Sequence, residues 1–241
     1  MTLAVLMACA GPAHRELPDV PQADAALPGG GAQFCAPAAA VDMLAWLADS
    51  GHPSLGPTDS AALRARVGEL GEVMGVDPER GTSLRRVSRG LATWLEGRDV
   101  DASVRVIGWR PRDDAHSRGR QVTLESVRSG LLPDAGALLN IGWYVEDEGT
   151  LTRVGGHWVA LAGLQGRTAW VVDPSTRAGT TPVTHRVALT APSATMLMGD
   201  YVGLPVWSAD VLSIEGLVEP AGVEQALVDG VVVVELTRGR P

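Results

Sequence analysis

Apolar residues recur every three to four positions through three segments in the first half of the chain, which is the spacing of one buried helix face. The segments run from Cys35 to Asp49, from about Ser60 to Met74 and from about Leu84 to Leu95. Good helix formers fill the first segment. Thr, Ser or Asp residues stand just before the second and third, where they can act as N-caps. The pattern therefore predicts a helical N-terminal half.

After Asp99 the spacing changes to alternation and to short apolar runs bounded by turn residues, which is typical of β-strands. Strands are predicted over 103–107, 137–145, 157–164, 168–173 and 230–236. A polar, Arg-rich loop over 110–120 and a short helix over 123–131 follow the first of them. Because helices come first and strands later, we expect an α+β fold. A helical lobe, residues 35–98, should pack on an antiparallel β-sheet lobe, residues 100–241.

The composition predicts one domain, over residues 20–241, that can bury a core of its own. The chain has 241 residues, 45% of them hydrophobic, and only two cysteines, so no disulfide framework is expected. The net charge is −8, and all 20 basic residues are Arg, scattered among Asp and Glu. No basic stripe is present to neutralise phosphates, which excludes nucleic acid as a partner.

Residues 1–19 are predicted to form a leader and tether. The apolar run from Leu3 to Ala10 is shorter than the about 20 residues that span a bilayer, and it ends in small residues as secretory signals do. Leu6-Met7-Ala8-Cys9 resembles the lipobox of bacterial lipoproteins, in which the Cys is lipidated. We expect an exported protein, either secreted or in the periplasm or cell envelope, that touches a membrane only through a lipid on Cys9. The alternative is an apolar start with no role.

Cys35 opens the first predicted helix, within Gln33-Phe34-Cys35-Ala36-Pro37-Ala38-Ala39. A thiol at a helix N-terminus lies at the positive end of the helix dipole, beside unpaired backbone N–H groups. This environment favours the thiolate, and the same N–H groups can stabilise an oxyanion. The structural alternative is a small buried hydrophobic residue, which is what most free cysteines are.

His157 and Asp173 are predicted near the same end of one hairpin. His157 follows Gly155-Gly156 at the start of its predicted strand, and Asp173 ends the next strand beyond a turn at 165–167. An imidazole can deprotonate a thiol near neutral pH, and a carboxylate can fix the tautomer and orientation of that imidazole. Each residue alone is also explained by an ordinary strand end. Together with Cys35 they supply a nucleophile, a base and an orienting group.

The ordered set Cys35-Ala36-Pro37-Ala38, Gly156-His157-Trp158-Val159 and Asp173-Pro174 resembles the bacteriocin-processing (double-glycine) type of papain-like cysteine peptidase, in its free-standing secreted bacterial form. The resemblance covers residues 20 to 175 of this chain. It implies a papain-like fold and a hydrolase that cleaves peptide or amide bonds of a peptide or protein substrate, with no cofactor. It also implies that Cys35 is the nucleophile, His157 the base and Asp173 the orienting group.

The chain departs from this family pattern at three places. Ala36 stands where the family has Gly, and Gly29 stands where it has an oxyanion-hole Gln, six residues before the nucleophile. Gln22 can take that role if residues 23–34 form an inserted loop; Gln33 is nearer in sequence but too close to fold back over the thiol. The region after Asp173 matches nothing in the pattern.

Two other functions would use the same residues. A catalytically silent domain of this type can serve as a binding module, which the departures at Ala36 and Gly29 favour. A transglutaminase-type acyl transfer uses the same triad. We expect no metal site, because the remaining histidines are isolated and no Cys or His spacing is typical of a metal, and we expect a monomer. These histidines are His14, His52, His116 and His185.

Overall fold

The computed structural model describes residues 14–109, 121–176, 184–191, 196–198, 206–207 and 211–237. The predicted signal with Cys9 and the Arg-rich loop 110–120 lie outside these residues, so lipidation and export stay predictions. Among the described helices, none has the length and apolar character that crossing a bilayer requires.

The helices follow the periodicity of the sequence closely. The α-helices are α1 Cys35–Asp49, α2 Ser60–Met74, α3 Leu84–Glu96 and α4 Leu124–Ser129, and 3-10 turns form at η1 Pro28–Gly31 and η2 Pro53–Leu55. The side chain of Asp59 caps α2, and that of Ser83 caps α3, by accepting backbone N–H groups of the first turn. The predicted helical half is confirmed, and α4 confirms the short helix predicted over 123–131.

The strands form one mostly antiparallel sheet. They are β1 Ala102–Gly108, β2 Ala135–Asp147, β3 Thr150–Gln165, β4 Thr168–Val172, β5 Thr184–Thr190, β6 Met196–Met198, β7 Val206–Trp207, β8 Ser213–Glu215 and β9 Gln225–Leu236. β3 and β6 pair in parallel, which the prediction of an antiparallel sheet missed. The remaining described pairs are antiparallel. The chain is therefore an α+β protein, as predicted.

Part of the sheet closes into a ring. β2 pairs with β3, β3 with β4, β4 with β5, β5 with β8, β8 with β9, and β9 again with β2. β1 lies outside this ring on β9, and β6 and β7 extend the sheet beside β3. Apolar side chains fill the interior of the ring, among them Ile141, Val159, Leu161 and Val231. Each of these six strands thus pairs with a neighbour on both sides over at least part of its length.

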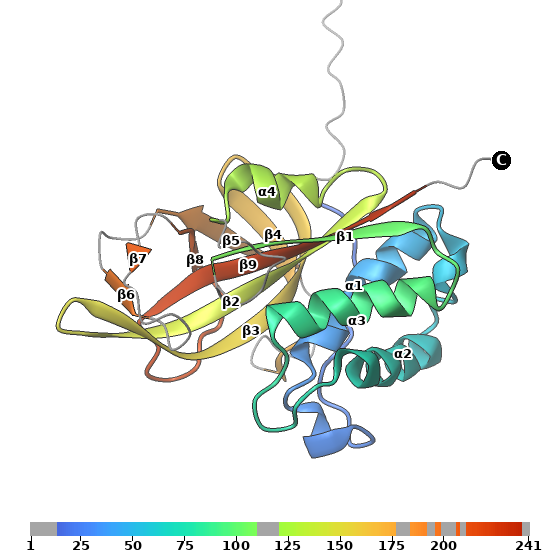
Figure 1. The fold of residues 1–241 in the computed structure, drawn as a ribbon, viewed down its shortest axis with the longest axis horizontal. Helices are drawn as coiled ribbons and strands as arrows, with labels where there is room; N and C mark the ends of the chain where they lie inside the picture. Colours follow the sequence, from blue (N-terminus) through green and yellow to red (C-terminus); the bar gives the residue numbers. More distant parts are fainter. Residues whose placement is uncertain are drawn as a thin grey trace, which may run out of the picture.

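A second apolar cluster fills the space between the helices and the outer face of the ring. Figure 1 shows α1, α2 and α3 gathered on one side of β2, β3 and β9. Because side chains alternate along a strand, Trp158 and Ala160 of β3 join the helices in this cluster, whereas Val159 points into the ring. The Trp158 indole also donates a hydrogen bond to the carbonyl of Thr82, just before α3, at 3.1 Å. The helices are thus held to the Trp158 face of β3, and the His157 side chain, one residue earlier, points to the other face.

The strand that carries His157 is longer than the sequence predicts. β3 begins at Thr150, so His157 lies inside it and not at its start. Gly155 and Gly156 were expected to precede the strand, but they pair with Trp143 and Gly142 in the β2–β3 ladder, beside a bulge. A glycine weakens a strand without ending it when its partner strand continues, and for this reason the prediction was wrong.

Residues 14–22 run along the outside of the domain. The Arg15 guanidinium lies 3.8 Å over the ring of Trp46 on α1 and donates a 2.7 Å hydrogen bond to the carbonyl of Ala135 at the start of β2. Burial lowers the pKa of Arg15 to about 10. The backbone N–H of Val20 donates to the carboxyl group of Asp42, whose pKa burial raises well above its ordinary value. This segment therefore bridges helices and strands, although residues 14–19 were predicted as tether.

Candidate active site

Cys35 is the first residue of α1 and is 8% exposed. The N-cap residue, Phe34, makes no side-chain hydrogen bond to the first turn of the helix. Beyond Cys35, α1 is buried almost along its whole length, so the core holds its N-terminus in place. The thiol therefore lies at the positive end of a fixed helix dipole, as the sequence predicts.

His157 and Asp173 meet at one end of the β3–β4 pair. β3 and β4 are antiparallel with Ala160 opposite Val172, which brings Asp173, directly after β4, beside His157. His157 Nε2 lies 2.6 Å from Asp173 Oδ1, and both residues are 3% exposed. A hydrogen bond this short between buried groups holds the ring in one orientation.

The side chain of Cys35 lies near enough to His157 to act on its pKa. Burial by itself lowers the pKa of His157, but the hydrogen bond to Asp173, the influence of Cys35 and the charges of both residues outweigh it and raise the pKa to about 9. Because Asp173 engages Nε2, the nitrogen that remains for the thiol is Nδ1. The structure thus brings the three predicted residues together, with Asp173 bonded to the imidazole and Cys35 near enough to act on its pKa.

Gln22 lies beside the loop that leads to Cys35. Its side-chain amide donates to the carbonyl of Ala32 at 2.8 Å and approaches that of Gly31 at 3.4 Å. Its backbone N–H donates to the carbonyl of Pro174 at 3.0 Å. Residues 23–34 form a loop that closes on itself through a 3.2 Å hydrogen bond from the Asp24 N–H to the Gly30 carbonyl.

Gln33 takes another direction. A side chain at Gly81 would lie 3.1 Å from Gln33 Oε1, so the Gln33 amide stands against the loop between α2 and α3. Gly81 needs to be glycine at its φ of +73°, a region that other residues rarely adopt. Of the two glutamines, Gln22 is the one that contacts backbone on either side of the thiol site.

Two further residues that the sequence does not single out contact the base or its partner. The Trp143 indole on β2 stacks on the His157 ring, with centroids 6.2 Å apart and planes 17° apart. The backbone N–H of Ser175 donates to Asp173 Oδ1 at 2.9 Å. The contact of Ser175 could have been predicted from the sequence Asp173-Pro174-Ser175, because an Asp side chain often accepts the backbone N–H two residues further on. No sequence pattern predicts the contact of Trp143 with His157, since it depends on the β2–β3 register.

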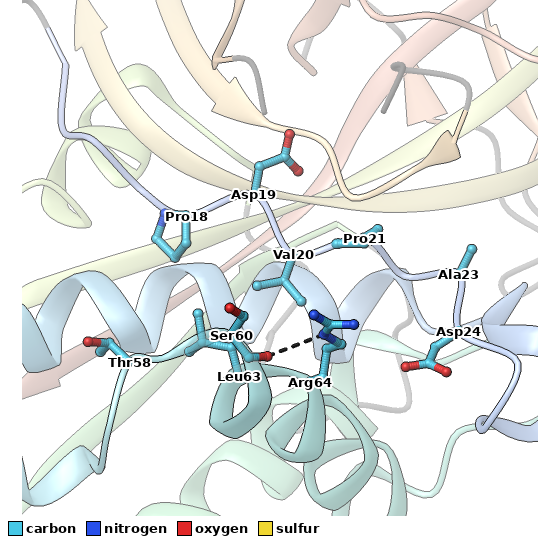
Figure 2. A pocket seen from close by; sticks show the side chains of 10 residues that line it. All are labelled: Pro18, Asp19, Val20, Pro21, Ala23, Asp24, Thr58, Ser60, Leu63 and Arg64. Atoms are coloured by element: carbon cyan, nitrogen blue, oxygen red, sulfur yellow. Dashed lines mark hydrogen bonds between the residues drawn. The ribbon is translucent and has the colours of Figure 1, made fainter. Parts of the chain in front are cut away.

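A pocket of about 610 Å³ lies on the helical side, beside the segment that leads to Gln22. Figure 2 shows Pro18–Pro21, Ala23 and Asp24 along one wall and Thr58, Ser60, Leu63 and Arg64 along the other. The three residues of the thiol site do not line it, so this pocket is not the candidate reaction centre. No cluster of three or more His, Cys, Asp or Glu side chains that could hold a metal ion occurs among the described residues.

Comparison with models of known protein families finds no match to the chain, and comparison with curated proteins finds no similar sequence.

Proposed function

We propose that the protein is a cysteine hydrolase of papain-like fold that cleaves peptide or amide bonds. The observation that carries the proposal is that His157 is bonded to Asp173 and interacts with Cys35, which stands at the N-terminus of α1. A helical layer against a closed antiparallel ring, with the thiol on a helix and the imidazole on a strand, supports the same class of fold.

In this mechanism His157 takes the thiol proton, and the Cys35 thiolate attacks the carbonyl carbon of the scissile bond. The carbonyl oxygen becomes an oxyanion, which the Cys35 backbone N–H and the Gln22 side-chain amide would stabilise. The imidazolium then gives its proton to the leaving amine as the C–N bond breaks. Water, deprotonated by His157, attacks the resulting thioester, which releases the acid and restores the thiol. Asp173 stabilises the imidazolium and does not take the proton.

The first test measures the reactivity of Cys35 against pH. A free thiol has an ordinary pKa of about 8.5, and below that pH its ionised fraction falls about tenfold for each unit by which the pH drops. Because the pKa of His157 is raised to about 9, its cation persists through neutral pH beside Cys35 and should raise the reactivity of that side chain. Iodoacetamide labelling of Cys35, followed by peptide mass spectrometry, should be at least about tenfold faster at pH 6 in the wild type than in His157→Ala.

The variant Asp134→Asn is the control for this labelling. Asp134 lies 3.0 Å from Nε2 of another histidine, His52, at the opposite end of α1. Its removal should leave the rate unchanged. Equal rates in the wild type and His157→Ala, each rising tenfold per pH unit, would mean that no thiolate–imidazolium pair forms.

A second prediction concerns the oxyanion. Gln22→Ala should lower kcat by about 100-fold with little change in KM, because a donor that acts on the oxyanion stabilises the transition state more than the bound substrate. Gln33→Ala, whose amide points to Gly81, should change kcat by less than about twofold. Steady-state kinetics on one peptide substrate measures both. A larger loss of kcat in Gln33→Ala than in Gln22→Ala would mean that Gln33, and not Gln22, is the oxyanion donor.

One observation favours a second candidate function. Cys35 is 8% and His157 3% exposed, so little of the site is open to a substrate. A catalytically silent domain that binds peptides without cleaving them would have such a closed site.

Transglutaminase-type acyl transfer to an amine would use the same triad. Adding an amine to the hydrolysis assay distinguishes this reaction from hydrolysis, because acyl transfer forms a new amide product.

A further inference from the structure

The Trp143 indole covers one face of the imidazole of the candidate base. The two aromatic rings stack with their centroids 6.2 Å and their planes 17° apart. Trp143 is 4% exposed and His157 is 3% exposed, so water has little access to either side chain. The indole is therefore a buried neighbour of the imidazole on its face, whereas Asp173 engages the same imidazole at Nε2.

The strand register explains how the indole reaches His157. Ile141 of β2 stands opposite His157 of β3, and Trp143 stands opposite Gly155. Side chains two positions apart on a strand point to the same face, so Trp143 is a diagonal neighbour of His157. An aromatic side chain can span the about 7–8 Å between diagonal neighbours. The contact thus follows from the pairing of β2 with β3.

Small residues on both sides of Trp143 leave room for its indole. Gly155 lies opposite Trp143 on β3, and Ala226 lies opposite it on β9. A side chain at Gly155 would begin 3.3 Å from Cδ1 of Trp143, which is tighter than ordinary van der Waals contact. Because glycine has no side chain, the indole can lie across β3 toward His157.

The other groups that act on the charge of His157 come from α1 and from the end of β4. Burial lowers the pKa of His157, whereas the Asp173 carboxylate, directly after β4, and the Cys35 side chain, at the start of α1, raise it. The neighbours that β2 supplies on this face, Ile141 and Trp143, carry no ionisable group. Stabilisation of the imidazolium by these β2 side chains therefore falls to the indole.

We propose that Trp143 is a positioning residue for the hydrolysis, whose indole stabilises the imidazolium of His157 by a cation–π interaction and holds it against Asp173. This inference rests on the proposed function. The face of an indole carries partial negative charge and attracts a cation within about 6 Å of its centroid, most strongly where water is excluded. Because the leaving amine takes its proton from the imidazolium, the indole keeps the acid form of His157 available at higher pH.

The experiment titrates the His157 ring by NMR in Trp143→Leu and in Trp143→Phe. Both replacements are smaller than Trp, but only Phe keeps an aromatic face, and its attraction for a cation is weaker than that of Trp. The pKa of His157, about 9 in the wild type, should fall by about 1 in Trp143→Leu and by about half as much in Trp143→Phe. Equal values in the two variants, or a value in Trp143→Leu at or above that of the wild type, would overturn the proposal.

Trp158→Phe is the matched control for this titration. Trp158 is the next residue of β3, is 2% exposed, and lies on the opposite face, where its indole donates to the carbonyl of Thr82. Its replacement should lower the melting temperature and leave the pKa of His157 unchanged. A shift in Trp158→Phe as large as that in Trp143→Leu would mean that any loosening of β3 moves the pKa, and the proposal would be wrong.

Kinetics separate the proposed role of Trp143 from a purely structural one. In Trp143→Leu, the alkaline limb of kcat/KM against pH should move to lower pH by as much as the pKa of His157 falls, because activity requires the imidazolium proton. A profile that drops as a whole, with this limb unmoved, is the result of a structural role and would contradict the proposal. If the wild type cleaves no peptide, the proposed function fails, and the NMR titration, which needs no substrate, still decides whether the indole stabilises the imidazolium.

Discussion

Replacing Cys35 with alanine is expected to lower kcat/KM for a peptide or amide substrate by at least about 10,000-fold. No other described side chain at the site can form the thioester, because His157 and Asp173 supply only proton transfer and charge. The substitution removes one sulfur from a residue that is 8% exposed at a helix end, so thermal unfolding should change little. Steady-state kinetics and a melting curve on the same preparation measure both effects.

Cys9→Ala is the matched control for this loss. Cys9 is the other cysteine of the chain, and its replacement should leave hydrolysis and the labelling of Cys35 unchanged. Cys35→Ser keeps the shape of the side chain with a far less acidic nucleophile, and it should also lose most activity. A Cys35→Ala protein that cleaves as fast as its parent would end the proposal of a cysteine hydrolase.

The second large effect is expected at the base, with a smaller one at its partner. His157→Ala should be nearly as severe as Cys35→Ala, because it removes the group that deprotonates the thiol and later protonates the amine. Asp173→Asn should cost about 10–100-fold, the range measured for groups that orient metal ligands and used here by analogy. Without the Asp173 charge, burial lowers the pKa of His157 with less opposition, so less of the imidazolium forms.

Kinetics of both variants on one substrate, with the histidine ring titrated by NMR, measures this order. The His157 titration should move from about pH 9 to a lower value in Asp173→Asn. An inactive Asp173→Asn together with a His157→Ala that keeps substantial activity would reverse the assigned roles.

The helical half of the fold was predictable because each of its signals is local. The bounds predicted for α1 and α2 agree with those observed, since N-caps and a 3.6-residue apolar period depend only on nearby residues. The β-strands were less predictable. β9 begins at Gln225 and not at 230, since a bulge between Asn140 and Ile141 of its partner β2 leaves Asp229 outside the ladder and interrupts the alternation.

The sequence by itself determined the α+β class and the identity of the three residues at the candidate site. A thiol at a helix start, an imidazole beside two glycines and a carboxylate at a strand end are each marked by their neighbours in the chain. Their meeting through a hairpin of antiparallel strands followed from the short turn at residues 165–167.

Only the tertiary structure showed that the Gln22 amide donates to the carbonyl of Ala32, that Trp143 stacks on His157, and that Arg153, Asp229 and Tyr144 form one cluster. The physical reason is common to all three. Each contact depends on strand register and loop closure between segments far apart in sequence, and a shift of one residue in register would turn every side chain of a strand to the opposite face.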